Sequence, residues 1–206
     1  MKSIYDFIVE PKNTRYNNTK KVGDKDLILN TEVFNHQYVS REAIIKQLPI
    51  AIETELQIGD EVIVHHNVFR RWHNIRGEEK NSRSYIDDNN YCVNESQVFS
   101  YKRDNEDWKT LSGYCFVKPI KSNDDFVTEK EECFFGIMKY MDPILSKNGV
   151  KEGDLVGFTP YSEYEFVIDG DRLYRVLTTE ISIKYEYQGN EEEHNPSWAH
   201  SGWGIN

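Results

Sequence analysis

The sequence has few cysteines and no long apolar run. Its three cysteines, Cys92, Cys115 and Cys133, are odd in number and lack the close spacing of metal ligands. We therefore expect reduced, buried thiols in a cytoplasmic protein. No apolar stretch approaches the roughly 20 residues that a membrane-spanning helix needs, so we expect no membrane association. The opening "MKSIYDFIVEPK" has no signal-peptide core, because Asp6 and Glu10 interrupt it.

Motifs typical of catalysis and metal binding are also missing. The chain contains no G-x-S-x-G, no phosphate-binding glycine loop and no H-E-x-x-H. His65 and His66 are adjacent, so on a strand their side chains point to opposite faces and cannot share a metal. Glu131 and Glu132 fail as an acid–base pair for the same reason. We expect a protein that is not an enzyme and that needs no metal and no cofactor.

Basic residues are outnumbered by acidic ones, 25 to 35, which gives a formal net charge of -10. Nucleic acids and anionic membranes are polyanions, so this balance argues against general binding to either. At 38% hydrophobic and 29% charged residues the composition is that of a soluble globular protein, and the mean hydropathy of -0.72 suggests thin cores or long polar loops. Small units with thin cores gain stability by assembling, so we expect a homo-oligomer.

Short strand-like runs fill the sequence, and helix signals are scarce. Runs rich in Val, Ile, Phe and Tyr, such as "DEVIVHH", "GYCFVKP" and "YEFVID", are separated by turn dipeptides such as Gly-Asp and Asp-Gly. The best helical candidate, "SREAIIKQL" at 40–48, fits a strand equally well. The pattern predicts an all-β protein of small barrels or sandwiches.

Three pairs of similar segments indicate an internal repeat. "FIVEPK" aligns with "CFVKPI", "LQIGDEVIV" with "GVKEGDLVGF", and "YCVNESQVFSYK" with "YRVLTTEISIKY". The offset is 108 between Pro11 and Pro119 (119 − 11) and 94 between Gly59 and Gly153 (153 − 59). It is 83 for the third pair, whose first tyrosines are residues 91 and 174 (174 − 91). Because the anchors keep their order, we predict two related units in tandem.

The predicted organisation is a first unit at 1–103, a second at 104–187 and a C-terminal tail at 188–206. Because the offset decreases along the chain, the first unit is longer than the second. It carries two insertions, called excursions below, one within 12–43 and one within 66–90. In β-domains such extra length usually forms surface loops, where binding residues tend to lie.

The order of these anchors resembles the GroES co-chaperonin family, over roughly 150 residues of the chain. The second unit supplies "FVKPI", "VKEGDLVGF" and "YRVLTTEISIKY". The first supplies "FIVEP", "DLILNTEVF", "LQIGDEVIV" and "YCVNESQVFSYK". The resemblance implies a small, partly open β-barrel in each unit and a ring of copies that caps a chaperonin to assist protein folding. Tandem members of the family occur in chloroplasts, and bacteriophages carry single-unit members, so a host cytoplasm is a plausible location.

The family binds its chaperonin through an aliphatic triplet on a mobile loop between its first two anchors. The matching residues are Leu27, Ile28 and Leu29 within "KKVGDKDLILNTE". Polar and glycine-containing flanks favour a disordered segment, from which three aliphatic side chains can enter an apolar groove. The alternative interpretation of these residues is an ordinary strand. The second unit has no comparable triplet.

Two further segments are candidates for partner binding. The excursion "FRRWHNIRGEEKNSRS" at 69–84 carries five basic residues against two acidic ones, with Arg70, Arg71, Trp72 and Arg76 close together. It suits a phosphate, a nucleic acid or an acidic protein surface, although a solvated loop with internal ion pairs explains it equally. The tail offers Trp198 and Trp203 as anchors on a partner, against the alternatives of disorder and packing on its own barrel. A structural or assembly role for the whole protein is the alternative to co-chaperonin function.

Overall fold

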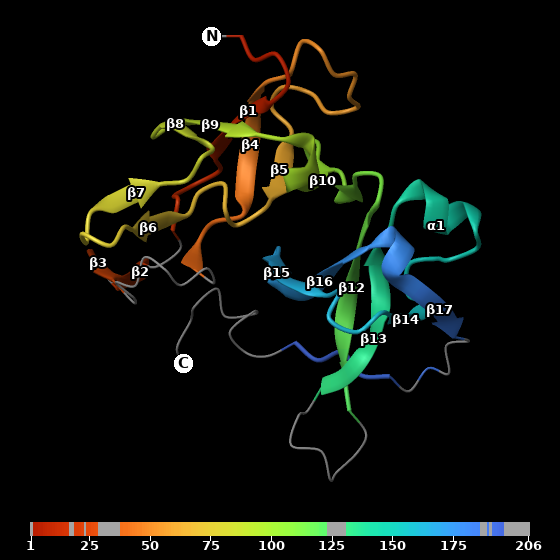
Figure 1. Cartoon of the computed structure of the whole chain (residues 1–206). Helices are drawn as coiled ribbons and strands as arrows, with labels where there is room; N and C mark the ends of the chain where they lie inside the picture. Colours follow the sequence, from red (N-terminus) through yellow and green to blue (C-terminus); the bar gives the residue numbers. More distant parts are fainter. Residues whose placement is uncertain are drawn as a thin grey trace. The chain divides into compact units, whose positions relative to one another are not determined.

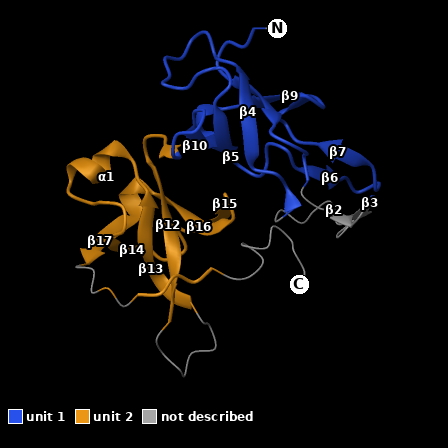
Figure 2. Cartoon of the chain, turned by 180° about the vertical axis from the view of Figure 1, so that it is seen from behind, with its two compact units in different colours: residues 1–108 blue, residues 109–206 orange. Residues whose placement is uncertain are grey.

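The computed structural model describes residues 2–16, 19–22, 24–28, 38–122, 131–185, 189 and 191–195. Its regular structure is almost entirely β, which confirms the prediction of an all-β protein. The chain divides into two compact units, residues 1–108 and 109–206 (Figure 1, Figure 2). Leu29, Trp198 and Trp203 lie outside the described residues.

Unit 1 contains ten of the strands. They are β1 (Phe7–Pro11), β2 (Thr19–Val22), β3 (Lys25–Ile28), β4 (Glu42–Gln47), β5 (Glu61–Val64), β6 (Arg71–His73), β7 (Glu79–Asn81), β8 (Tyr85–Asp87), β9 (Asn90–Val93) and β10 (Val98–Lys102). With the short β11 (Lys109–Thr110), six of them form a sheet in the order β11-β10-β5-β4-β1-β9-β8. The pairs β2–β3 and β6–β7 are separate hairpins. The helical candidate at 40–48 is therefore a strand, β4.

In its described residues, unit 2 contains one sheet and one short α-helix. Its elements are β12 (Tyr114–Lys121), β13 (Glu131–Tyr140), α1 (Pro143–Lys147), β14 (Leu155–Phe158), β15 (Tyr164–Ile168), β16 (Asp171–Leu177) and β17 (Ile181–Tyr185). The strand order is β15-β16-β12-β13-β14-β17. Among the described strands neither sheet closes on itself, because the two end strands of each do not pair with each other.

The strands of the two units pair in one common order. Without β11, the order in unit 1 is β10-β5-β4-β1-β9-β8, and in unit 2 it is β17-β14-β13-β12-β16-β15. Val9 of β1 lies opposite Tyr91 of β9, and Val117 of β12 lies opposite Tyr174 of β16. These pairs differ by 108 (117 − 9) and 83 (174 − 91), the offsets found between the sequence anchors.

The irregularities of the sheets also recur at equivalent positions. The register of β1 against β4 shifts between Ile8 and Val9, and that of β12 against β13 shifts between Phe116 and Val117. A bulge inserts a residue and bends its strand, so it is a specific feature of a sheet. This register shift recurs 108 residues later (117 − 9), and β12 has a second shift, between Pro119 and Lys121.

The two Gly-Asp dipeptides form the same turn before β5 and before β14. Gly59 and Gly153 have φ values of 96° and 88°, a left-handed conformation that favours glycine. The Asp60 carboxylate accepts a hydrogen bond of 2.8 Å from the amide three residues earlier. The Asp154 carboxylate accepts the equivalent bond at 2.7 Å. The sequence places Gly and Asp together because the turn needs both.

Apolar side chains of the strands form the core of each unit, and consecutive residues of the central strands β1 and β12 are buried. Phe7 and Val9 of β1 are fully buried in unit 1. In unit 2 the buried cluster includes Cys115 and Val117 of β12 with Met138 of β13. The predicted excursions of unit 1 contain the two separate hairpins: β2–β3 lies between β1 and β4, and β6–β7 lies between β5 and β8. Figure 1 shows β6 and β7 extending away from the sheet.

Candidate functional site

The sequence-predicted aliphatic triplet begins on a strand. Leu27 and Ile28 are the last two residues of β3, where they lie opposite Lys20 and Thr19 of β2. A disordered segment was expected here, but residues 25–28 pair as a strand, the alternative that the sequence had left open. Hydrogen bonding between the two strands of a hairpin explains the difference, because it satisfies backbone groups that a disordered loop leaves to water.

The predicted basic residues lie together on the β6–β7 hairpin. Arg71 and Trp72 belong to β6, Arg70 precedes it, and Arg76 lies in the turn. Trp72 is 45% exposed. Two ion pairs form inside the hairpin, from Arg71 Nη1 to Glu79 Oε1 at 3.0 Å and between the side chains of residues 80 and 78 at 3.1 Å. These ion pairs neutralise part of the positive charge, which weakens the case for a nucleic-acid site.

The base of this hairpin is bonded to the segment that follows β1. The guanidinium of Arg15 donates to the Phe69 carbonyl at 3.3 and 3.2 Å and to the Asn81 side chain at 2.9 Å. The Arg71 amide donates to the Tyr16 hydroxyl at 2.7 Å, and the Arg71 guanidinium carbon lies 4.8 Å from the centre of the Tyr16 ring. The two excursions of unit 1 are thus joined at their bases. Sequence reasoning missed Arg15 and Tyr16, because their partners lie more than 50 residues away.

A cavity of about 400 Å³ lies beside this junction. It is lined by Glu10, Pro11, Asn13, Thr14, Arg15, Tyr16, Arg71, Asp88 and Asn89. The guanidinium carbon of Arg15 lies 5.3 Å from the ring centre of Tyr85 and 5.4 Å from that of Tyr91. Burial raises the pKa of Tyr91 to about 12. The cavity is large enough for a small ligand or for a few residues of a peptide.

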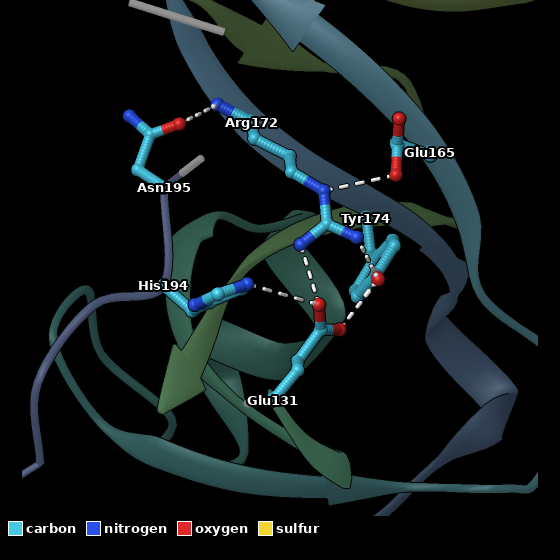
Figure 3. A network of polar contacts seen from close by, with 6 residues as sticks. All are labelled: Glu131, Glu165, Arg172, Tyr174, His194 and Asn195. Carbon is cyan, nitrogen blue, oxygen red and sulfur yellow. Dashed lines mark hydrogen bonds and ion pairs between the residues drawn. The ribbon is translucent and has the colours of Figure 1, made fainter. Parts of the chain in front are cut away.

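A second polar cluster joins four segments of unit 2 (Figure 3). The Arg172 guanidinium donates to Glu165 at 2.9 Å and forms an ion pair with Glu131. Tyr174 accepts a hydrogen bond from Arg172 and donates one to Glu131. Burial lowers the pKa of Arg172, but its bonds to Glu131 and its other partners outweigh this, so the pKa is raised. His194 approaches the Glu131 carboxylate at 3.9 Å.

A cavity of about 370 Å³ adjoins this cluster. Its lining residues are Glu131, Cys133, Phe134, Phe158, Glu163, Tyr174 and His194. Burial raises the pKa of Tyr174 well above its usual range, and the hydrogen bond to Glu131 adds to the shift. A phenol held protonated in this way does not serve as a base near neutral pH. The cluster therefore links β13, β15, β16 and the C-terminal segment, and its geometry indicates a structural role.

One expectation about histidines is wrong. β5 ends at Val64, so the side-chain alternation of a strand does not extend to His65 and His66. Their rings stack, with centroids 4.3 Å apart. Across the described ranges, no group of three or more His, Cys, Asp or Glu side chains is arranged to hold a metal ion. Nor does any helix in that part of the chain have the length and apolar character to cross a membrane.

No protein-family model matches the chain, and no curated protein matches it.

Proposed function

We propose that this chain is a non-enzymatic binding protein of the co-chaperonin type, built from two copies of one small, partly open β-barrel domain. The observation that carries the proposal is the agreement between the units: one strand order, one bulge position and one Gly-Asp turn. The offsets that relate the paired strands equal those between the sequence anchors that resemble the GroES family. Copies of the chain would assemble into a ring on a chaperonin in a bacterial cytoplasm, and ATP hydrolysis would belong to the chaperonin.

The docking element of this proposal is the β2–β3 hairpin with the residue that follows it. It is inserted between β1 and β4, where the family carries its mobile loop, and it includes Leu27, Ile28 and Leu29. Each aliphatic side chain that enters an apolar groove contributes roughly 1.5–3 kcal/mol before ordering costs. The equivalent connection in unit 2, between β12 and β13, is much shorter, so the docking role is assigned to unit 1.

The test is nucleotide-dependent binding to a purified bacterial chaperonin. The wild type is compared with the triple variant Leu27→Ser, Ile28→Ser, Leu29→Ser. The matched control is Ile4→Ser, Ile50→Ser, Ile58→Ser, which removes three exposed aliphatic side chains elsewhere in unit 1 (58%, 67% and 66% exposed). We expect the wild type and the control to bind in the presence of ATP and the triple variant to lose binding at least about 30-fold.

Two results would contradict the proposal. Equal loss in the control would mean that general apolar contact, and not the triplet, causes binding. No binding by folded wild type, to this chaperonin or to that of the natural host, would leave an assembly role for the barrels as the better explanation.

A further inference from the structure

The edge of β12 is covered by a different segment over each half of the strand. β16 pairs with β12 only from Tyr114 to Val117. Beyond that point the C-terminal segment continues the pairing: the Lys121 amide donates to the Glu192 carbonyl at 2.8 Å. The His194 amide donates to the Pro119 carbonyl, also at 2.8 Å. Residues 192–194 therefore form an isolated antiparallel β-bridge with this edge, between Ile120 and Glu193, which we call the added strand.

Side chains of the added strand match the charges beneath them. Glu193 forms an ion pair of 2.9 Å with Lys118, and Lys118 also lies 3.4 Å from the Asp171 carboxylate. Glu192 pairs with Lys121. Figure 3 shows the segment continuing to Asn195, whose side chain accepts a hydrogen bond from the Arg172 amide. The space enclosed by these residues has no room for a water molecule.

The corresponding edge in unit 1 belongs to β1, which ends at Pro11, two residues before the counterpart of Lys121. By the offsets of 108 and 83, Lys118, Pro119, Asp171 and Arg172 of unit 2 correspond to Glu10, Pro11, Asp88 and Asn89 of unit 1. Asp171 and Arg172 begin β16, whereas Asp88 and Asn89 form the turn before β9. All four of these unit 1 residues line the cavity of about 400 Å³. The position that the C-terminal segment fills in unit 2 is thus a cavity in unit 1.

Backbone groups of β1 face this cavity. Lys12 donates its amide to the Glu42 carbonyl on the β4 side. Main-chain groups of successive strand residues alternate in direction, so the carbonyl of Pro11, the last residue of β1, faces the opposite side. Asn13 lies two residues beyond the end of β1 and lines the cavity. By the offset of 108, the Pro11 carbonyl and the Asn13 amide correspond to the Pro119 carbonyl and the Lys121 amide, which bond the added strand in unit 2 (119 − 11 and 121 − 13). Within the part of the chain that the structure describes, the Asn13 amide donates to no other residue.

We propose that this cavity, the strand slot of unit 1, binds an extended segment of a partner protein antiparallel to β1. The segment's main chain would bond the Pro11 carbonyl and the Asn13 amide, as residues 192–194 bond β12. This surface goes beyond chaperonin docking and does not depend on it, because it uses neither β2 nor β3.

Charge identifies the occupant as a strand with a basic residue. In unit 2 the residue at the centre of the added strand is Glu193, which faces Lys118. In unit 1, Glu10 stands in place of Lys118, and Asp88 stands in place of Asp171 (118 − 108 and 171 − 83). A glutamate there would face two carboxylates, so the chain's own C-terminal segment is a poor fit. A lysine or arginine at that position suits the slot.

The remaining charges near the slot have partners within unit 1. Lys46 pairs with Glu10 at 2.9 Å and offsets part of its charge, whereas Asp88 accepts a hydrogen bond from the neutral Tyr85 hydroxyl. Arg71 pairs with Glu79, as described above. Arg15 also lines the slot and donates to two neutral acceptors, the Phe69 carbonyl and the Asn81 side chain, so its charge reduces the attraction for a basic side chain. The acidic group that a basic side chain would contact is the carboxylate of Asp88.

Two labelled peptides test the proposal by fluorescence anisotropy against the full chain. One has the sequence of residues 189–195, "GNEEEHN", and the other carries Glu193→Lys, "GNEEKHN". We expect the lysine peptide to bind about five-fold more tightly, the size of effect that partly exposed charge pairs produce. Glu10→Lys in the protein should reverse this preference, and Glu10→Gln should reduce it.

A matched pair of variants assigns the binding to the slot. Asn13→Pro removes the amide that bonds the added strand, whereas Asn13→Ala keeps it, so only the proline variant should lose binding of the lysine peptide. Circular dichroism melting checks that both variants fold. If the proline variant does not fold, the Glu10 variants show whether the peptides bind in the slot. If neither peptide binds, the proposal that the slot binds an extended segment is wrong. Tighter binding of the native peptide through Asn13 would overturn the charge argument and indicate exchange of this segment between copies.

Discussion

Asp142 connects three segments of unit 2, and its removal should destabilise that unit strongly. The side chain is fully buried. One carboxylate oxygen accepts the amides of Ile144 and Leu145 at 2.9 and 3.0 Å, which caps the N-terminus of α1. The other oxygen accepts the Gly113 amide at 3.0 Å and the Thr178 hydroxyl at 2.9 Å. One carboxylate therefore joins the approach to β12, the start of α1 and the turn before β17.

The size of the loss follows from these four bonds. Asp142→Ala removes a helix cap, which costs about 1–2 kcal/mol. It also leaves the Gly113 amide without an acceptor, at about 1–2 kcal/mol more, while the Thr178 hydroxyl can rotate to another partner. We expect a loss of about 3 kcal/mol in the free energy of unfolding of unit 2. Asp142→Asn keeps one acceptor oxygen for α1 and should lose about half as much.

Hydrogen exchange measured by mass spectrometry suits this test, because peptides from residues 109–185 report unit 2 separately from unit 1. Burial opposes the ionised form of Asp142, but its hydrogen bonds outweigh burial, so the pKa in the folded state is lowered. A lowered folded-state pKa means that the stabilisation is complete above the usual pKa of about 3.9 and disappears as pH falls through the folded value. The difference between wild type and Asp142→Ala should therefore narrow below about pH 4. A loss under about 1 kcal/mol at pH 7, or a difference that stays constant with pH, would refute this reasoning.

Two further predictions concern other residues of the sheets. Gly136→Ala should cost unit 2 about 1–2 kcal/mol in urea unfolding, because the new Cβ would lie 2.7 Å from the Lys118 carbonyl oxygen. The counterpart of Gly136 in unit 1 is the buried Ala43, because Gly136 lies opposite Pro119 and Ala43 lies opposite Pro11 (136 − 93 = 43). Ala43→Gly should also destabilise its unit. A stabilising effect of Gly136→Ala would contradict the packing argument. Iodoacetamide at pH 8 should modify the exposed Cys133 quickly but modify Cys115 only on unfolding, because burial raises the pKa of the Cys115 thiol to about 12. Peptide mapping measures both rates, and equal rates would show that Cys115 is accessible.

The strand content and the turns of the fold could be predicted from the sequence, because they depend on neighbouring residues. Short apolar runs mark β1 and β12, and each Gly-Asp dipeptide marks one turn that requires a positive φ. The common offsets were visible for the same reason, since Pro11 and Pro119 occupy one position in two similar strands. Residues 40–48 were ambiguous because a run of that length fits either period.

Contacts between distant segments could not be predicted in this way. Asp142 forms hydrogen bonds with Gly113 and Thr178, which are 29 and 36 residues away in the sequence, and no local sequence pattern predicts either bond. Arg15 likewise reaches Asn81 across 66 residues. The helix α1 was missed because its five residues are too short for helical periodicity, and the cap that stabilises it is part of the same long-range network. Whether a sheet closes is also a property of end strands far apart in the chain.

The strand that residues 192–194 add to β12 affects the order in which the chain folds during synthesis. Every strand of unit 1 precedes residue 103, so its sheet can form while the ribosome is still translating unit 2. The outer half of the β12 edge, by contrast, has to wait until residue 194 leaves the exit tunnel. An open edge on a nascent chain invites pairing with other chains, and lysine on such an edge opposes it. Lys118 and Lys121 can thus protect the nascent protein from aggregation before they bind the glutamates that later cover them.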